Sequence, residues 1–500
     1  MIILRSKLIN MKNLLIINFL IFSYSVIAQD GKPQDYLSSE FHEGRREALR
    51  EKMPSNSVAV FFANPVRNRA NDVDYVYHQD PDFYYLTGYK EPHAVLVIFS
   101  EEQKSNNGED YDEMLYVQER NPQAEMWTGY RLGVEGAKKD LGFNTVYNGK
   151  EFLNNKIDFS EFESVLHKPF FNDYRDSRDP ADLASLVMTF KNQVHINEIQ
   201  NNSRGSLGVE VKQEEGPTKT VNIDTESLKT YMGELRQIKL PEEMKLLKKA
   251  VRISAMGQIE VMKAMHPGMS EAEVQGLHEY VYKKYGSEYE GYPSIVGAGN
   301  NGCVLHYIEN NKTKLEQDLV LMDLGAEYHG YTADVTRTIP ANGKYNTEQR
   351  AIYDLVYKAQ EAGIAAAVVG NNSSDTHKAG QEIINQGLYE LGIISSPDAQ
   401  HMYFPHGTSH HIGLDVHDLN TRGSYQSNMV ITVEPGIYIP EGSDCDEKWW
   451  GIAVRIEDDI LITENGPVNL SAEAPRKAQE IEAMMRKPSV FDNLKLPELN

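Results

Sequence analysis

Five residues in the second half of the chain have side chains that suit a pair of divalent metal ions. They are four carboxylates and one imidazole: Asp323, Asp334, His410, Glu434 and Glu457. An oxygen-rich set with one nitrogen donor favours Mn²⁺ over thiolate-binding metals. Two such ions about 3.5–4 Å apart can activate a shared water as a nucleophile. These residue types therefore predict metal-assisted hydrolysis.

The first two carboxylates belong to neighbouring predicted strands. Asp323 lies in a short apolar run and Asp334 in a run rich in β-branched residues. If the turn between the runs centres on Tyr328 and His329, the two aspartates face each other with Cβ atoms roughly 4.5–5.5 Å apart. Carboxylates so close repel each other unless cations lie between them. The alternative is a pair of solvated hairpin acids, and the apolar run around Asp323 argues against it.

The third candidate ligand lies in a segment that is unusually rich in histidine. His406, His410 and His417 follow one another closely, in a stretch that also contains glycines. A lone histidine is more often an ordinary core or surface residue, but imidazole is also the commonest metal-binding side chain. Three histidines together therefore indicate a functional segment.

The last two candidate ligands occur with apolar runs. Glu434 ends the run 429–433 and precedes a Pro-Gly turn, whereas Glu457 lies in the run 451–459, which predicts one strand. Arg455, two residues before Glu457, shares its face of that strand. Each motif alone is weak, but their order and spacing together are specific.

Together these motifs resemble those of the Xaa-Pro aminopeptidases, also called aminopeptidase P, which are metallopeptidases with the pita-bread fold. All five ligand positions are filled, and the resemblance extends through the N-terminal half. The matching stretches are Arg67–Tyr75, Asp82–Tyr89, Tyr292–Tyr307, Leu321–Gly325, Asp334–Thr338, His406–Asp418, Val433–Tyr438 and Val454–Asp459.

The resemblance implies an α+β protein with an N-terminal α/β creatinase-like domain and a C-terminal pita-bread domain. In the pita-bread fold, two pseudo-symmetric helix–helix–hairpin halves surround a curved antiparallel sheet. The sequence pattern agrees, because residues 241–340 and 348–463 each give two helical stretches followed by strands. Pro241 is placed to begin the first long helix, and Ser270 with Glu273 forms a capping-box pattern for the next.

The resemblance also implies how the metal ions are held. Asp323 and Asp334 are expected to bind the first ion, and Asp334 and Glu457 to bridge the two ions. A hydroxide shared by the ions is expected to attack the bond between an N-terminal residue and proline. The expected ligands of the second ion are Asp334, His410, Glu434 and Glu457.

Three residues are expected, by resemblance, to take part in the reaction. Glu434 would carry a proton to the leaving proline nitrogen. His306 and His417 would donate hydrogen bonds that stabilise charge on the substrate's carbonyl oxygens.

Four further residues are expected to bind the substrate or orient the ligands. His406, Tyr438 and Arg455 resemble the residues that shape the proline pocket, and Tyr292 and Arg455 would orient the carboxylates. A purely structural role stays open for Tyr292 and Tyr438, because buried tyrosine hydroxyls usually find a partner.

Three rival functions remain at this point. Prolidases share the fold and the ligands but cleave Xaa-Pro dipeptides. Creatinase-like hydrolases share the fold but need no metal and lack the ligand set, which is complete in this chain. A non-catalytic binding protein of the same fold would be expected to have lost ligands.

Residues 1–28 have the pattern of an export signal. Arg5, Lys7 and Lys12 precede a short apolar run, and small residues up to Ala28 suit cleavage. Because the run is short for a spanning helix, no stable membrane insertion is expected after cleavage, and an uncleaved anchor is the alternative. The predicted location is periplasmic or secreted. The rest of the chain is expected to form an N-terminal domain, a catalytic domain and a closing helix with a tail: residues 29–225, 226–470 and 471–500.

Composition excludes some partners. The 500-residue chain has 73 acidic and 50 basic residues, a formal charge of −23 and no basic stripe, so nucleic acid is not expected as a partner. By resemblance, the partners are peptides with proline in the second position and further copies of the chain, as a homodimer or homotetramer. The two cysteines, Cys303 and Cys445, are too few for a disulfide framework.

Overall fold

The computed structural model describes residues 33, 35–105, 108–154, 157–177, 179–195, 221–493 and 496. The predicted signal peptide, residues 1–28, lies outside the described residues. The chain divides into two compact units, Met1–Leu37 and Ser38–Asn500, and everything that follows concerns the second. Among the described residues, none of the helices combines the length and apolar character needed to cross a bilayer.

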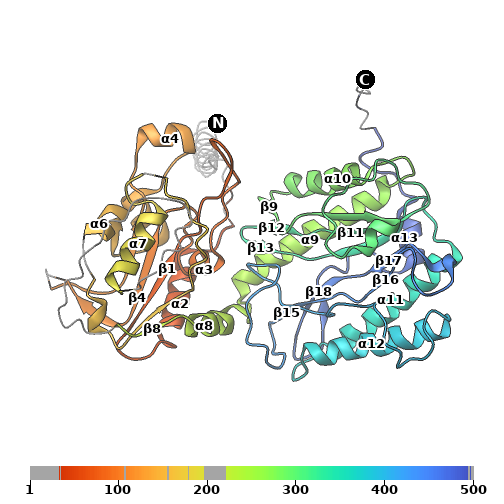
Figure 1. Ribbon diagram of the computed structural model, residues 1–500. Coiled ribbons are helices and arrows are strands. Elements are labelled where there is room, and N and C mark those ends of the chain that lie inside the picture. The colour runs from red at the N-terminus through yellow and green to blue at the C-terminus, as the bar shows by residue number, and fades with distance from the viewer. Residues whose placement is uncertain are drawn as a thin grey trace, which may run out of the picture. The chain divides into compact units, whose positions relative to one another are not determined.

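The N-terminal part is built on a six-stranded sheet, coloured red to yellow in Figure 1. Its apolar strands are buried, and β1 pairs antiparallel with β4 and parallel with β7. Helices such as α2 (Ser39–Arg50), α3 (Pro81–Thr87) and α7 (Leu183–Gln193) accompany the sheet. The strand order across the sheet is β6 (Val146–Asn148), β5 (Asp110–Val117), β4 (Val95–Lys104), β1 (Ser57–Phe62), β7 (Ser164–His167) and β8 (Ile223–Asp224).

The first half of the C-terminal part begins with two packed helices, as expected. After α8 (Ser227–Arg236), α9 (Pro241–Ala264) begins at Pro241, whose fixed φ and missing N–H suit the first turn. The next helix, α10 (Glu271–Lys284), is capped by Ser270, whose hydroxyl accepts a hydrogen bond of 3.0 Å from a first-turn amide.

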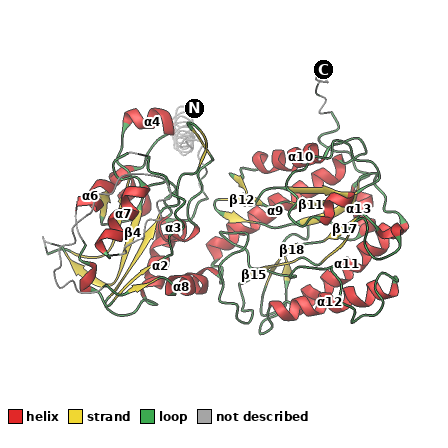
Figure 2. Cartoon of the chain, in the orientation of Figure 1, coloured by secondary structure: helices red, strands yellow, loops and turns green. Residues whose placement is uncertain are grey.

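The second half repeats this order. It begins with α11 (Thr347–Ala366) and α12 (Ser373–Glu390), which pack against each other as α9 and α10 do. Asn346 and Asn372 cap these helices with capping boxes. In Figures 1 and 2, the two helix pairs lie on either side of the strands. The predicted helix–helix–strand repetition is therefore present, followed by α13 (Ala478–Met484).

The strands between the helix pairs form short sheets that are almost entirely buried. In the first half, β11 lies between β10 and β14, and β12 pairs with β13. In the second half, β15 pairs with β18, and β16 pairs with β17. Their bounds are β10 (Ile295–Ala298), β11 (Leu319–Asp323), β12 (Ala326–Tyr328), β13 (Tyr331–Thr332), β14 (Thr336–Pro340), β15 (Val430–Val433), β16 (Gly436–Ile439), β17 (Ile452–Arg455) and β18 (Asp458–Leu461).

The predicted register of the first hairpin is wrong. The turn between β12 and β13 consists of His329 and Gly330, with φ of +50° and +88°, so it lies one residue later than expected. Two positive φ values suit the right-handed twist of a tight hairpin, and glycine at the second position accepts them. Asp323 therefore faces Thr336, and Asp334 lies in the irregular segment between β13 and β14.

The predicted single strand over 451–459 is also divided. β17 ends at Arg455 and β18 begins at Asp458, and the two strands pair with different neighbours. Glu457 lies in the break between them. The break frees its side chain from strict alternation along one strand.

Candidate metal centre and active site

One cavity of about 570 Å³ brings the predicted site residues together. All of them line it except Tyr438, whose hydroxyl contacts two lining residues, His406 and Arg455, at 2.8 and 2.9 Å. Asp323 and Asp334 are 7% and 5% exposed, which rules out a pair of solvated hairpin acids.

The five candidate metal ligands converge on one wall of this cavity. Single ligand atoms of Asp334, His410 and Glu457 all lie within 4.8 Å of one another. His410 Nε2 is 3.4 Å from Asp334 Oδ2 and 3.6 Å from Glu434 Oε1. Asp323 joins them through Tyr292, whose hydroxyl donates to Asp323 Oδ1 at 2.6 Å and lies 2.5 Å from Asp334 Oδ1.

The electrostatics of these acids fit divalent cations. Burial, together with repulsion from Glu457, raises the pKa of Glu434 to about 8. Burial likewise raises the pKa values of Asp334 and Glu457, and the neighbouring carboxylates add to the shift. Acids that repel one another in a buried site are stabilised in their charged forms by a cation. The donor set of carboxylates and one imidazole therefore fits hard divalent ions.

Asp323 differs because a buried cation contacts it. Burial alone would raise the pKa of Asp323, but the charge of Arg455 and hydrogen bonds from Tyr292 and Arg455 lower it below its usual value. The Arg455 guanidinium donates to Asp323 Oδ2 and to the Tyr438 hydroxyl. Arg455 thus links the carboxylate cluster to the predicted proline pocket.

Two further histidines line the cavity near the candidate ligands. His306 and His417 are exposed within it, and the ring of His417 lies 4.3 Å from the ring of His410. Burial, then the neighbouring His410 and His306, lower the pKa of His417, so its neutral form is favoured at neutral pH. Ring N–H groups here can donate hydrogen bonds to a bound carbonyl oxygen.

His406 is fixed by its neighbours. Its Nδ1 is 2.7 Å from the carbonyl of Gly407 and therefore carries the proton, which leaves Nε2 to accept from the Tyr438 hydroxyl at 2.8 Å. Burial and the nearby Arg455 lower the pKa of His406 to about 4, in keeping with a neutral ring. Its Nδ1 also lies 3.6 Å from Glu434 Oε2.

Several residues that hold the candidate ligands were not identified from sequence. Thr336 Oγ1 donates to Glu457 Oε2 at 2.7 Å, and Asp459 Oδ2 accepts from the Asp334 amide at 3.1 Å. Thr432 Oγ1 accepts from the His410 amide at 3.1 Å. Each lies in or beside a predicted strand near a ligand, but spacing alone does not show which ligand it contacts.

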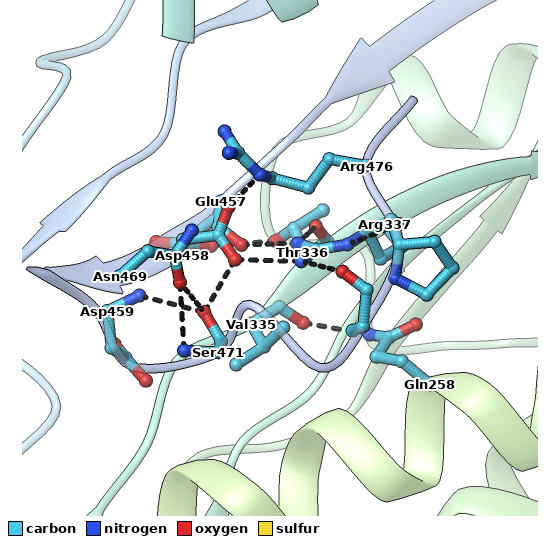
Figure 3. Close-up of polar contacts among 12 residues, drawn as sticks. Gln258, Val335, Thr336, Arg337, Glu457, Asp458, Asp459, Asn469, Ser471 and Arg476 are labelled. Atoms are coloured by element: carbon cyan, nitrogen blue, oxygen red, sulfur yellow. Dashed lines mark hydrogen bonds and ion pairs between the residues drawn. The ribbon is translucent and has the colours of Figure 1, made fainter. Parts of the chain in front are cut away.

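A buried arginine joins the two halves behind the site. Arg337 donates to the carbonyl oxygens of Thr336 and Glu457 at 2.8 and 2.6 Å and to Asp458 Oδ1 at 2.7 Å. Asp458 also accepts from Ser471 at 2.5 Å. Figure 3 shows these contacts as one network around Asp458. The network fixes the backbone that carries Glu457.

The chain matches two family models. Residues 245–464 match "Metallopeptidase family M24", and residues 42–160 match "Aminopeptidase P, N-terminal domain". The chain is 35% identical to the Xaa-Pro aminopeptidase of Escherichia coli over 464 residues, which covers 90% of this chain and 98% of the relative. The Haemophilus influenzae Xaa-Pro aminopeptidase is also 35% identical, over 463 residues, with the same coverage.

Solved structures agree with this relationship. Aminopeptidase P from Escherichia coli with the inhibitor Pro-Leu has a TM-score of 0.76 at 34% identity, covering 90% of this chain and 98% of that one. Pseudomonas aeruginosa aminopeptidase PepP has a TM-score of 0.77 at 30% identity, covering 90% and 99%. The predicted two-part α+β architecture with a pita-bread domain is confirmed, and these relatives favour the main interpretation over the prolidase and binding-protein alternatives. The chain belongs to the Xaa-Pro aminopeptidases of the M24 metallopeptidase family.

Proposed function

We propose that this protein releases the N-terminal residue from peptides whose second residue is proline. The observation that carries the proposal is the convergence of three buried carboxylates, the partly buried Glu434 and His410 on one cavity. The same cavity is also lined by His306, His406 and His417. Two relatives are Xaa-Pro aminopeptidases, and their similarity covers 90% of this chain.

The carboxylates and His410 would hold two divalent ions, and the oxygen-rich donor set favours Mn²⁺. Asp323 and Asp334 would bind one ion, and Asp334 and Glu457 would bridge the pair. When bound, the ions supply an acidified water as nucleophile near neutral pH. The ligands of the second ion would be Asp334, His410, Glu434 and Glu457.

The protein's own residues would then transfer a proton and stabilise the negative charge that develops on the substrate. Glu434 would take up a proton and deliver it to the departing proline nitrogen. His306 and His417 would donate hydrogen bonds to carbonyl oxygens of the peptide as negative charge develops there. Both rings reach the cavity.

The proline ring would lie against His406, Tyr438 and Arg455. These three side chains are already joined by hydrogen bonds of 2.8 and 2.9 Å, so the pocket is rigid before the peptide arrives. Tyr292 would orient Asp323 and Asp334, since its hydroxyl lies within 2.6 Å of both carboxylates.

The test compares an Xaa-Pro-Yaa tripeptide with an Xaa-Pro dipeptide. We expect cleavage of the tripeptide, loss of cleavage after chelation and recovery when Mn²⁺ is added. Turnover of the dipeptide alone would support a prolidase. No turnover of either peptide with metal present would overturn the proposal.

We further propose that the protein is exported and forms a homodimer or homotetramer. Export is supported by the charged and apolar pattern of residues 1–28 and would be checked by N-terminal sequencing, with Gln29 as the expected first residue. Contacts between copies could include Trp127, which is 86% exposed, and Arg67, which forms an ion pair with the exposed Asp173. Light scattering would show a monomer if the second proposal is wrong.

A further inference from the structure

A buried network of opposite charges lies beside the loop that carries His417. Asp418, the next residue, has a side chain that is 1% exposed. Its Oδ1 accepts from the guanidinium of Arg236, and its Oδ2 accepts from Lys239 Nζ at 2.8 Å. The side chains of Arg236 and Lys239 are 2% and 1% exposed. All three charges are thus withdrawn from water, and each cation contacts the carboxylate of Asp418.

Such a network resists displacement. Separating a buried ion pair leaves uncompensated charge in a poorly solvated place, so the partners stay in contact. Arg236 is itself held from the other side, because its Nη1 donates to Asp82 Oδ1 of α3 at 2.6 Å. Because Asp82 holds Arg236 in place, Arg236 cannot easily move together with Asp418, and it therefore fixes the position of Asp418.

The loop that carries His417 has no regular secondary structure and is held by scattered backbone hydrogen bonds, among them Ile412 N to Val430 O at 3.2 Å and Thr332 N to Gly413 O at 2.8 Å. Between α12 and β15, where every residue is described, the chain forms no helix or strand, and its one β-bridge joins His411 to Ile431. The loop folds back on Asp418, whose amide donates to the carbonyl of His411 at 2.8 Å. Gly413 approaches so closely that a Cβ there would lie 2.1 Å from Asp418 Oδ2.

The side chains of His417 and Asp418 have different surroundings, the first in the cavity and the second in the buried charge network. The His417 ring is exposed in the cavity, so packing around the ring does little to fix it. Its orientation depends on the backbone that it shares with Asp418. We propose that Asp418 is a positioning residue, whose pairing with Arg236 and Lys239 fixes the peptide backbone that presents His417 to the substrate. This inference rests on the proposed function, in which His417 acts on the peptide.

The experiment compares Asp418→Asn with Asp82→Asn. Both substitutions keep the side-chain shape and remove one buried carboxylate charge from Arg236, so both are expected to lower stability. Only the first weakens the loop's own contacts with Arg236 and Lys239, because in Asp82→Asn both contacts of Asp418 remain. At a temperature where both variants are folded, kcat for an Xaa-Pro-Yaa peptide should fall about tenfold or more in Asp418→Asn. Its KM, and both constants of Asp82→Asn, should stay within about twofold of wild type.

A second measurement reports on the ring without relying on turnover. In protein labelled at histidine Cε1, the resonance of His417, assigned by its loss in His417→Gln, should shift in Asp418→Asn and stay in place in Asp82→Asn. Equal effects of the two variants on kcat, or an unmoved resonance in Asp418→Asn, overturn the inference. An inactive wild type with a shifted resonance would instead count against the proposed function.

Should Asp418→Asn not fold, Lys239→Gln takes its place. It removes one of the two donors and leaves Arg236 paired. A fall in kcat of about threefold with unchanged KM is expected, because the loop keeps part of its anchor. An unchanged kcat in this variant would overturn the inference.

Discussion

His410 is the one nitrogen donor among the candidate ligands, and its ring is already oriented. Its Nδ1 lies 3.2 Å from the carbonyl oxygen of His411, so Nδ1 carries the proton and Nε2 presents its lone pair to Asp334 and Glu434. A hydrogen bond on the far nitrogen fixes the tautomer and makes the ligand nitrogen more basic. The protein thus prepares this ligand before any cation binds.

Replacing His410 should therefore separate metal binding from folding. We expect His410→Ala to lower kcat/KM by at least about 100-fold, since changes that only touch a ligand's neighbours already cost 10–100-fold. Peptide turnover measures the loss of activity, and calorimetric titration with Mn²⁺ measures the loss of metal binding. His266→Ala, at an exposed position outside the cavity, is the matched control and should behave as wild type. Normal turnover in His410→Ala would contradict the ligand assignment.

The sequence identifies those site residues whose type is unusual for their local surroundings. Asp323 stands out because an acid inside an apolar run needs a partner. Thr336 and Asp418 do not stand out, because a threonine in a strand and an acid in a loop are ordinary. Their roles arise from contacts with residues 121 and 182 positions away, and such contacts leave no mark on local spacing.

All four candidate carboxylates lie where strands end or break. Asp323 ends β11, Asp334 precedes β14, Glu434 lies between β15 and β16, and Glu457 lies between β17 and β18. The existence of these strands was predictable from apolar runs, but their register was not. The first hairpin shifted because its turn uses Gly330 at positive φ, and a one-residue change in the turn moves the partner of Asp323 by two.

Gly330 gives this hairpin a measurable energetic signature. Gly330→Ala places a side chain at positive φ, which costs about 1–2 kcal/mol. The new Cβ would also lie 3.0 Å from Tyr84 Cε1. Gly343→Ala is the matched control, because its φ of +80° is similar and nothing lies within 4 Å of the new Cβ.

Urea unfolding should show a lower free energy of unfolding in both variants, with the larger decrease in Gly330→Ala. Equal losses would mean that Tyr84 moves aside and that the turn alone sets the cost. No loss at either position would contradict the positive φ values.

The N-terminal part and the catalytic part are joined by polar contacts that vary with pH. His78 Nε2 lies 2.9 Å from both carboxylate oxygens of Glu327, which belongs to β12. The hydrogen bond to Glu327 raises the pKa of His78 more than burial lowers it. A raised folded-state pKa contributes stability that is complete below the usual imidazole value and is lost as the pH rises through the raised value.

His78→Gln should remove this pH dependence. The difference in unfolding free energy between wild type and His78→Gln is expected to be larger at about pH 6 than at about pH 8.5, since the histidine is charged only at the lower pH. Chemical denaturation at the two pH values measures it. A difference that is constant or grows with pH would show that the ion pair does not form.

The division of the ligands between the halves has a practical consequence. Asp323 and Asp334 come before the exposed turn at Gly343, and His410, Glu434 and Glu457 come after it. If the chain were cut at this turn, neither fragment would contain the complete set of metal ligands. Each fragment alone would be inactive, and turnover would return only when the two fragments reassociate. The fold could then serve as a split reporter, in which peptide hydrolysis shows that two proteins fused to the fragments bind each other.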